Sequence, residues 1–155
     1  MLDFLEHFPY ASTPLILLEC YRILSDKGEL VIQVPDAEIL ASVFVGSAKT
    51  RYLPFQCNRC GHWMNTNICD IGDDSCGECG QGLVDIREAA MMRMFGGQDF
   101  PGNFHQTCFT KEMLKLKAGH AGLQFLADED IQQQAPNWNF KLRFRRGDLW
   151  DASNG

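Results

Sequence analysis

The chain has 155 residues, of which 45% are hydrophobic and 22% charged, and this composition excludes a disordered tail and a collagen-like fibre. Its formal net charge of −6 disfavours a general nucleic-acid binder, because such proteins usually carry an excess of basic residues. No apolar run approaches the roughly 18 residues that span a bilayer, and the N-terminus lacks the basic stretch of a signal peptide. We therefore expect a soluble, cytoplasmic protein with no membrane partner.

The first third of the chain predicts a helix, a strand and a second helix. Ser12, Thr13 and Pro14 are typical of a helix N-terminus. This helix should continue to about residue 25 with a buried stripe that comprises Leu15, Leu18, Tyr21, Ile23 and Leu24. The apolar run at 29–35 predicts a buried strand. Asp36 should then cap a helix that ends near residue 46 and carries on one face Ile39, Leu40, Val43 and Phe44.

Two further helices are expected after residue 82. The first runs over about 85–95, since Asp85 and Glu88 have the spacing of a capping box and Gly96 and Gly97 provide a stop. A loop over 96–109 follows. Thr110 should then cap a helix that ends at Gly119 or Gly122 and contains Met113, Leu114 and Leu116.

Two strands close the chain, at 123–131 and 138–146. The second strand alternates, so that one face carries Phe140, Leu142 and Phe144 and the other carries Lys141, Arg143 and Arg145. We interpret the basic face as the solvated side of an edge strand, with a phosphate-binding strip as the alternative. The order of the elements predicts an α/β fold that ends in an antiparallel strand pair.

Four of the seven cysteines have the spacing of a metal site. They lie in the strings CNRCG and CGECG, which 15 residues separate, and they are Cys57, Cys60, Cys76 and Cys79. Two such turns aim four sulfurs at one ion, and the glycines that follow each turn tolerate positive φ. Because four sulfur ligands leave no open position, we expect a structural Zn²⁺ in a zinc-ribbon insert over 51–82. Iron in a rubredoxin-like site is the alternative.

The remaining cysteines have no such spacing. His62 and Cys69 are alternative ligands of the same ion, although the four-cysteine set needs neither. Cys20 lies in a helical pattern and Cys108 beside Phe109, and both are interpreted as small core residues.

A family resemblance rests on three strings outside this insert: DFLEHF at 3–8, ECYRILSDKGELVIQVPD at 19–36 and FGGQDFPGNFHQTCFTKEMLKLKAGHAGL at 95–123. They resemble, in this order, the end of the fourth strand, the helix and fifth strand, and the last loop and helix of a class I S-adenosylmethionine-dependent methyltransferase. The resemblance implies that 1–50 and 83–150 form a partial, Rossmann-like methyltransferase α/β domain. Residues 51–82 are then an insertion and 151–155 a tail.

The resemblance also implies a cofactor and several site residues. Glu6 and His7 would lie beside S-adenosylmethionine, and Gln98, Asp99 and His105 would face the substrate. His7 or His105 would act as the catalytic base. The residues alone also allow Glu6 to be a helix cap, His7 a surface residue and the loop a packed connection.

The Gly-rich cofactor turn of the family has no counterpart in this sequence. We therefore expect a C-terminal fragment of such an enzyme, inactive alone, whose methyl acceptor is unidentified. In such a fragment the strand at 29–35 keeps an unpaired apolar edge, which predicts a homo-oligomer through that edge. The alternative function is a non-catalytic interaction module, in which the zinc ribbon presents to a macromolecule His62, Trp63 and Met64.

Overall fold

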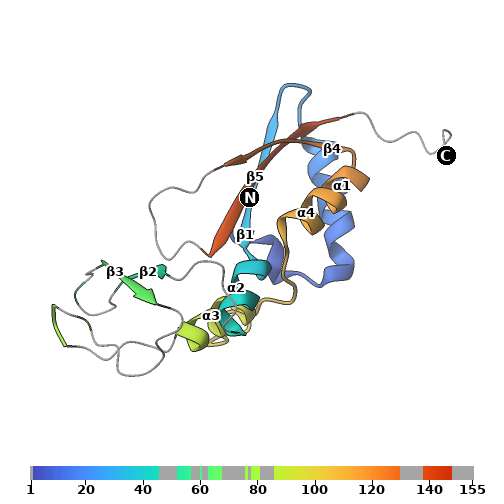
Figure 1. The fold of residues 1–155 in the computed structure, drawn as a ribbon. Helices are drawn as coiled ribbons and strands as arrows, with labels where there is room; N and C mark the ends of the chain where they lie inside the picture. Colours follow the sequence, from blue (N-terminus) through green and yellow to red (C-terminus); the bar gives the residue numbers. More distant parts are fainter. Residues whose placement is uncertain are drawn as a thin grey trace.

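A three-stranded antiparallel sheet organises the computed structural model (Figure 1). The structure describes residues 2–45, 52–56, 60, 63–67, 76, 78–80, 86–129 and 138–147. The sheet has the order β1-β5-β4, from strands β1 (Glu29–Pro35), β4 (Leu123–Glu129) and β5 (Asn139–Arg146). All three strands were expected from the sequence. The interpretation of the last strand as an edge was wrong, because β5 pairs with β4 on one side and with β1 on the other.

One face of the sheet forms the main hydrophobic core. Across β1 and β5 the apolar residues meet in register, as Ile32 opposite Leu142 and Val34 opposite Phe140. All four side chains are buried. Such cross-strand apolar pairs stabilise a sheet because their side chains shield one another from water. The alternation expected for the last strand is therefore confirmed.

Helices α1 (Thr13–Ile23) and α4 (Lys111–His120) lie side by side over this face (Figure 1). From α4, Leu114 and Ala118 enter the core, and from α1, Leu17 does. The stripe expected for α1 was partly wrong, because Leu15, Leu18 and Ile23 are exposed, whereas Tyr21 and Leu24 pack against the core. Residues 15–18 (LILL) are four consecutive apolar residues, so every side of this helical turn carries an apolar side chain. Which of them is buried therefore depends on how α1 packs against α4.

Two of the expected helix caps are confirmed, whereas Ser12, the N-cap residue of α1, makes no capping hydrogen bond with its side chain. The Asp36 carboxylate accepts hydrogen bonds from the amides of Glu38 (2.9 Å) and Ile39 (3.3 Å) at the start of α2 (Ala37–Phe44). The Thr110 hydroxyl accepts one from the amide of Met113 (3.2 Å) at the start of α4. Each cap satisfies amides that have no partner within the helix.

A second, smaller core joins α2 to α3 (Ile86–Phe95). It contains Leu40 and Val43 of α2, Ala90 of α3 and Trp138 at the start of β5. Phe44, expected on the same face of α2, is 54% exposed, so that part of the prediction was wrong. The expected stop after α3 is confirmed, since Gly96 has φ +79°. Asp85 and the side chain of Glu88 lie outside the described part of the chain.

The end of α4 distinguishes the two expected stop residues. Gly119 lies inside the helix, whereas Gly122 adopts φ +82° just after it. Only Leu114 of the three expected apolar positions is buried, because Met113 and Leu116 point away from the sheet. The helix therefore packs along a narrow stripe that includes Leu114 and Ala118, one turn apart.

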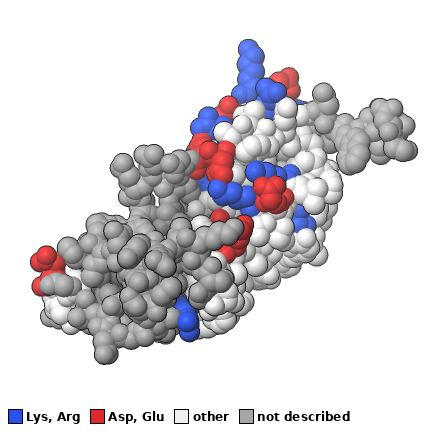
Figure 2. All heavy atoms as spheres, viewed as in Figure 1, with Lys and Arg blue, Asp and Glu red and all other residues white. Residues whose placement is uncertain are grey.

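The other face of the sheet is charged. Arg143 of β5 lies 3.2 Å from Glu29 of β1 and also pairs with Glu129 of β4, and Lys141 lies 2.6 Å from Glu129. Figure 2 accordingly shows basic side chains intermixed with acidic ones rather than a uniform basic strip. The carboxylates neutralise the basic residues, and this arrangement disfavours a phosphate-binding strip.

The N-terminal segment covers part of the outer edge of β1. The Asp3 amide donates to the Gln33 carbonyl oxygen at 2.9 Å, and Leu2 and Gln33 form a short parallel bridge. Two 3₁₀ turns follow, η1 (Leu5–His7) and η2 (Tyr10–Ser12). Oligomerisation through this edge stays a prediction.

An antiparallel hairpin lies within the expected insert. It pairs β2 (Tyr52–Gln56) with β3 (Trp63–Asn67), and the sequence had predicted no strands here. Residues 57–59 and 61–62 of its connection and the tail 151–155 lie outside the described residues. Within the described residues, the helices are too short and too polar to cross a bilayer.

Candidate metal-binding sites

Three cysteines of the expected metal site lie together. The Sγ atoms of Cys60, Cys76 and Cys79 are within 4.8 Å of one another, and those of Cys60 and Cys76 are 3.5 Å apart. Tetrahedral thiolates with metal–sulfur bonds of about 2.3 Å have sulfurs roughly 3.8 Å apart. The cluster can therefore hold a metal ion. The fourth expected ligand, Cys57, and the alternative ligands His62 and Cys69 lie outside the described residues.

A tight turn holds the second pair of these cysteines. The Gly80 amide donates to the Cys76 carbonyl oxygen at 2.8 Å, and Gly80 has φ +66°, as expected for the residue after the knuckle. This turn places Cys79 beside Cys76. Of the two cysteines expected in the core, Cys108 is exposed, so that interpretation was wrong, whereas Cys20 is half-buried. Burial raises the pKa of the Cys20 thiol, which makes it a poor nucleophile.

A second cluster joins the beginning of the chain to the loop after α3. Ligand atoms of Glu6, His7 and His105 lie within 4.8 Å of one another. The two imidazole rings meet edge to face, with centroids 4.8 Å apart and an interplanar angle of 87°. All three residues were site candidates in the sequence analysis. Nothing in the sequence, however, predicted that they form one cluster in which the two histidines are in contact.

Backbone hydrogen bonds fix the two segments of this cluster against each other. The Glu6 carbonyl oxygen accepts from the amides of Gln106 (2.8 Å) and Thr107 (3.2 Å). The Gln106 side chain donates to the His7 carbonyl oxygen at 3.0 Å. Since the His105 amide also bonds the Phe95 carbonyl oxygen at 3.0 Å, the loop is tied to the end of α3 as well.

Glu6 is buried, and its environment disfavours a charge. The residue is only 1% exposed, and neither carboxyl oxygen has a hydrogen-bond partner among the described residues. Burial raises the pKa of Glu6, and burial followed by the nearby His7 lowers the pKa of His105. Glu6 therefore caps no helix, and His7 is half-buried rather than exposed on the surface.

A polar network near this cluster was missed by the sequence analysis. The Asn139 side chain donates to Asp3 at 2.6 Å and accepts from Arg93 at 2.9 Å. It joins the N-terminal segment, α3 and β5, three elements that lie far apart in the sequence. Asp3 has a positive φ of 43°, which is uncommon for a residue other than glycine. No local motif marks these residues, because each partner lies on a different element.

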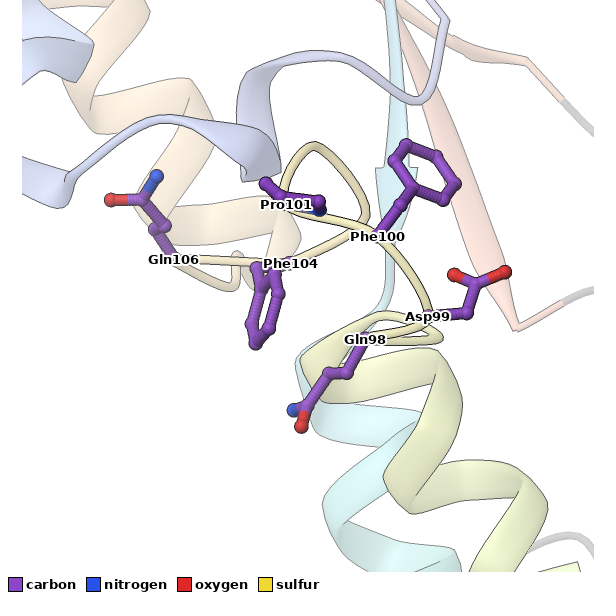
Figure 3. Close-up of a pocket in the computed structure, with 6 residues that line it drawn as sticks. All are labelled: Gln98, Asp99, Phe100, Pro101, Phe104 and Gln106. Atoms are coloured by element: carbon purple, nitrogen blue, oxygen red, sulfur yellow. The ribbon is translucent and has the colours of Figure 1, made fainter.

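The structure separates the three expected substrate-side residues. Gln98 and Asp99 line an open hollow of about 600 Å³, together with Phe100, Pro101, Phe104 and Gln106. Figure 3 shows that Asp99 and Phe100 point to one side of the loop and Gln98 to another. The His105 side chain lies with Glu6 and His7 instead. The hollow and the buried cluster are therefore two features of one loop.

Comparisons with known proteins give no match. This holds for the family models, for the curated proteins and for the solved structures.

Proposed function

We propose that this chain contributes the acceptor-side half of an S-adenosylmethionine-dependent methyltransferase. The observation that carries the proposal is that the three strings with the family resemblance meet in space. The segment 3–8 lies along β1, through the bond from Asp3 to Gln33, and the loop 95–109 packs on Glu6. In open α/β folds, ligands bind at such a junction of loops beyond the strand ends.

The proposal assigns roles to residues at this junction. Glu6 and His7 would border the cofactor, and Gln98 and Asp99, in the open hollow, would face the methyl acceptor. Methyl transfer needs little beyond alignment of nucleophile, methyl group and leaving sulfur, plus a base where the nucleophile carries a proton. His7 or His105 would supply that base.

Binding of S-adenosylmethionine tests this proposal. Because the sequence has no Gly-rich cofactor turn, we expect weak binding, with a dissociation constant of about 1 mM, or about 4 kcal/mol. Amide chemical shifts should move in two segments, 3–8 and 96–107, and should stay unchanged in β4. Shifts that stay unchanged at millimolar cofactor, or that spread evenly over the surface, would contradict the proposal.

We further propose that Cys60, Cys76 and Cys79, with Cys57, hold a structural Zn²⁺. The support is the three-sulfur cluster. With Cys57 as the fourth ligand, the thiolate set would be closed and would leave no position for a substrate. Co²⁺ substitution should give the intense thiolate charge-transfer band of a four-sulfur site, and Cys76→Ser should weaken it. Cys108→Ser, at an exposed position, is the control. A red protein as purified would instead indicate iron.

An interaction module built on this metal centre is the second candidate function. The same cysteine cluster supports it, because a structural metal stabilises a surface that can bind a macromolecule. The cofactor titration distinguishes the two candidates. An interaction module predicts no shifts with S-adenosylmethionine in the Glu6 segment, whereas the methyltransferase predicts them there.

A further inference from the structure

We propose that Glu6, His7 and His105 form a second metal site, which binds a divalent first-row transition cation such as Mn²⁺, Fe²⁺ or Co²⁺. This inference rests on the geometry of the three side chains and does not depend on the methyltransferase proposal. With the metal bound, His7 and His105 are its ligands and do not serve as the catalytic base. The proposed site also differs from the cysteine cluster in its ligands, which are one carboxylate and two imidazoles.

The donor set suits such a cation. Two histidines and one carboxylate on one side of an ion are a recurrent arrangement for divalent iron and related metals, and they leave further positions open. Metal bonds of about 2.0–2.2 Å place neighbouring ligand atoms roughly 3 Å apart. The ligand atoms here lie within 4.8 Å of one another, so small side-chain rotations bring all three onto one ion.

The buried polar atoms of the cluster point to a ligand. Both carboxyl oxygens of Glu6 and the Nδ1 atoms of His7 and His105 are buried without a hydrogen-bond partner among the described residues. Buried polar atoms are nearly always partnered, because an unpartnered one loses its hydrogen bonds to water without replacement. If Glu6 is protonated, its O–H group can donate one hydrogen bond to one imidazole nitrogen, which leaves the other carboxyl oxygen and the other imidazole without a partner. A divalent cation engages the carboxylate and both imidazoles at once and offsets the buried charge.

The surroundings hold the ligands in place. The backbone bonds of Gln106 and Thr107 to Glu6 fix the carboxylate segment against the histidine loop. The His105 amide donates to the Phe95 carbonyl oxygen at 3.0 Å, which ties the histidine loop to the end of α3. The open coordination positions would then be available to water or to a substrate oxygen.

Histidine NMR signals provide the test, because the chain contains four histidines. One equivalent of Zn²⁺ is added first, because soft thiolates take Zn²⁺ preferentially and the cysteine cluster is then filled while the second site stays free. Mn²⁺ is then added below stoichiometry. We expect it to broaden the ring signals of His7 and His105 selectively, while His120, exposed at the end of α4, stays sharp. The variants His7→Gln, His105→Gln and His120→Gln assign the signals.

Two variants measure the contribution of the ligands. Glu6→Gln keeps the shape of the side chain and removes its charge, so Mn²⁺ affinity by electron paramagnetic resonance should fall at least about tenfold, since even residues that only orient a ligand contribute that much. His120→Gln should leave the affinity unchanged. Three results would each overturn the proposal: uniform broadening of all four histidine ring signals, no bound Mn²⁺ in the wild type, or full Mn²⁺ affinity in a folded Glu6→Gln protein.

Discussion

Arg143 on the central strand β5 donates hydrogen bonds to Glu129 on β4, and this pair links the two closing strands on the charged face of the sheet. Lys141 and then Arg143 hold the pKa of Glu129 below its ordinary value of 4.5. A carboxylate with a lowered pKa in the folded state stabilises the fold above its unfolded pKa and loses that contribution as it is protonated.

Glu129→Gln should therefore destabilise the protein at neutral pH. The difference in melting temperature from the wild type should shrink as the pH falls below 4.5, because the wild-type carboxylate also loses its charge there. Glu112→Gln removes the same charge from the exposed face of α4 and is the control. A difference that is constant from pH 7 to pH 3 would rule out this electrostatic contribution.

Two leucines in the apolar segment 15–18 test which face of helix α1 is buried. Leu17 is fully buried in the main core, whereas Leu15 is 69% exposed. Leu17→Ala should lower the free energy of unfolding by about 2–5 kcal/mol, because it removes buried apolar contacts and leaves a cavity. Leu15→Ala should change it by less than about 0.5 kcal/mol. Denaturant titration of both variants measures the difference, and equal effects would contradict the packing described for α1.

These leucines also show how far the sequence determines the fold. The three strands of the sheet and the caps at Asp36 and Thr110 were predictable, because periodicity and capping are local signals. The central position of β5 was not predictable from the sequence, because it depends on pairing with β1, which lies about a hundred residues earlier in the chain. The cysteine cluster followed from spacing, whereas the contact between His7 and His105 depends on how a distant loop folds back.

Metal removal should affect the hairpin β2–β3 before the main sheet. The connection between these strands carries Cys57 and Cys60, so the proposed zinc closes the hairpin at its turn. An isolated two-stranded hairpin is marginally stable in water. After chelation, amides of the hairpin, such as Leu53, should exchange faster with solvent, while those of β5 should keep their protection. Unchanged exchange in the hairpin would mean that the metal does not support it.

Gly96 tests the backbone geometry that places the histidine loop. Its φ of +79° is strained for any side chain, and a Cβ atom at this position would overlap the backbone oxygen of Asn103. Gly96→Ala should therefore destabilise the protein by more than about 1 kcal/mol. It should also shift the ring signals of His105, because the His105 amide is bonded to the neighbouring Phe95.

Gly119→Ala is the matched control for this substitution. Gly119 lies within α4, is exposed, and has no heavy atom within 4 Å of the added Cβ position. Alanine is a better helix former than glycine by roughly 0.8–1 kcal/mol, so this variant should be more stable than the wild type. The two glycine variants should thus change the melting temperature in opposite directions. If Gly96→Ala were as stable as Gly119→Ala, the loop would not depend on a left-handed residue after α3, and the placement of His105 against Glu6 would need another cause.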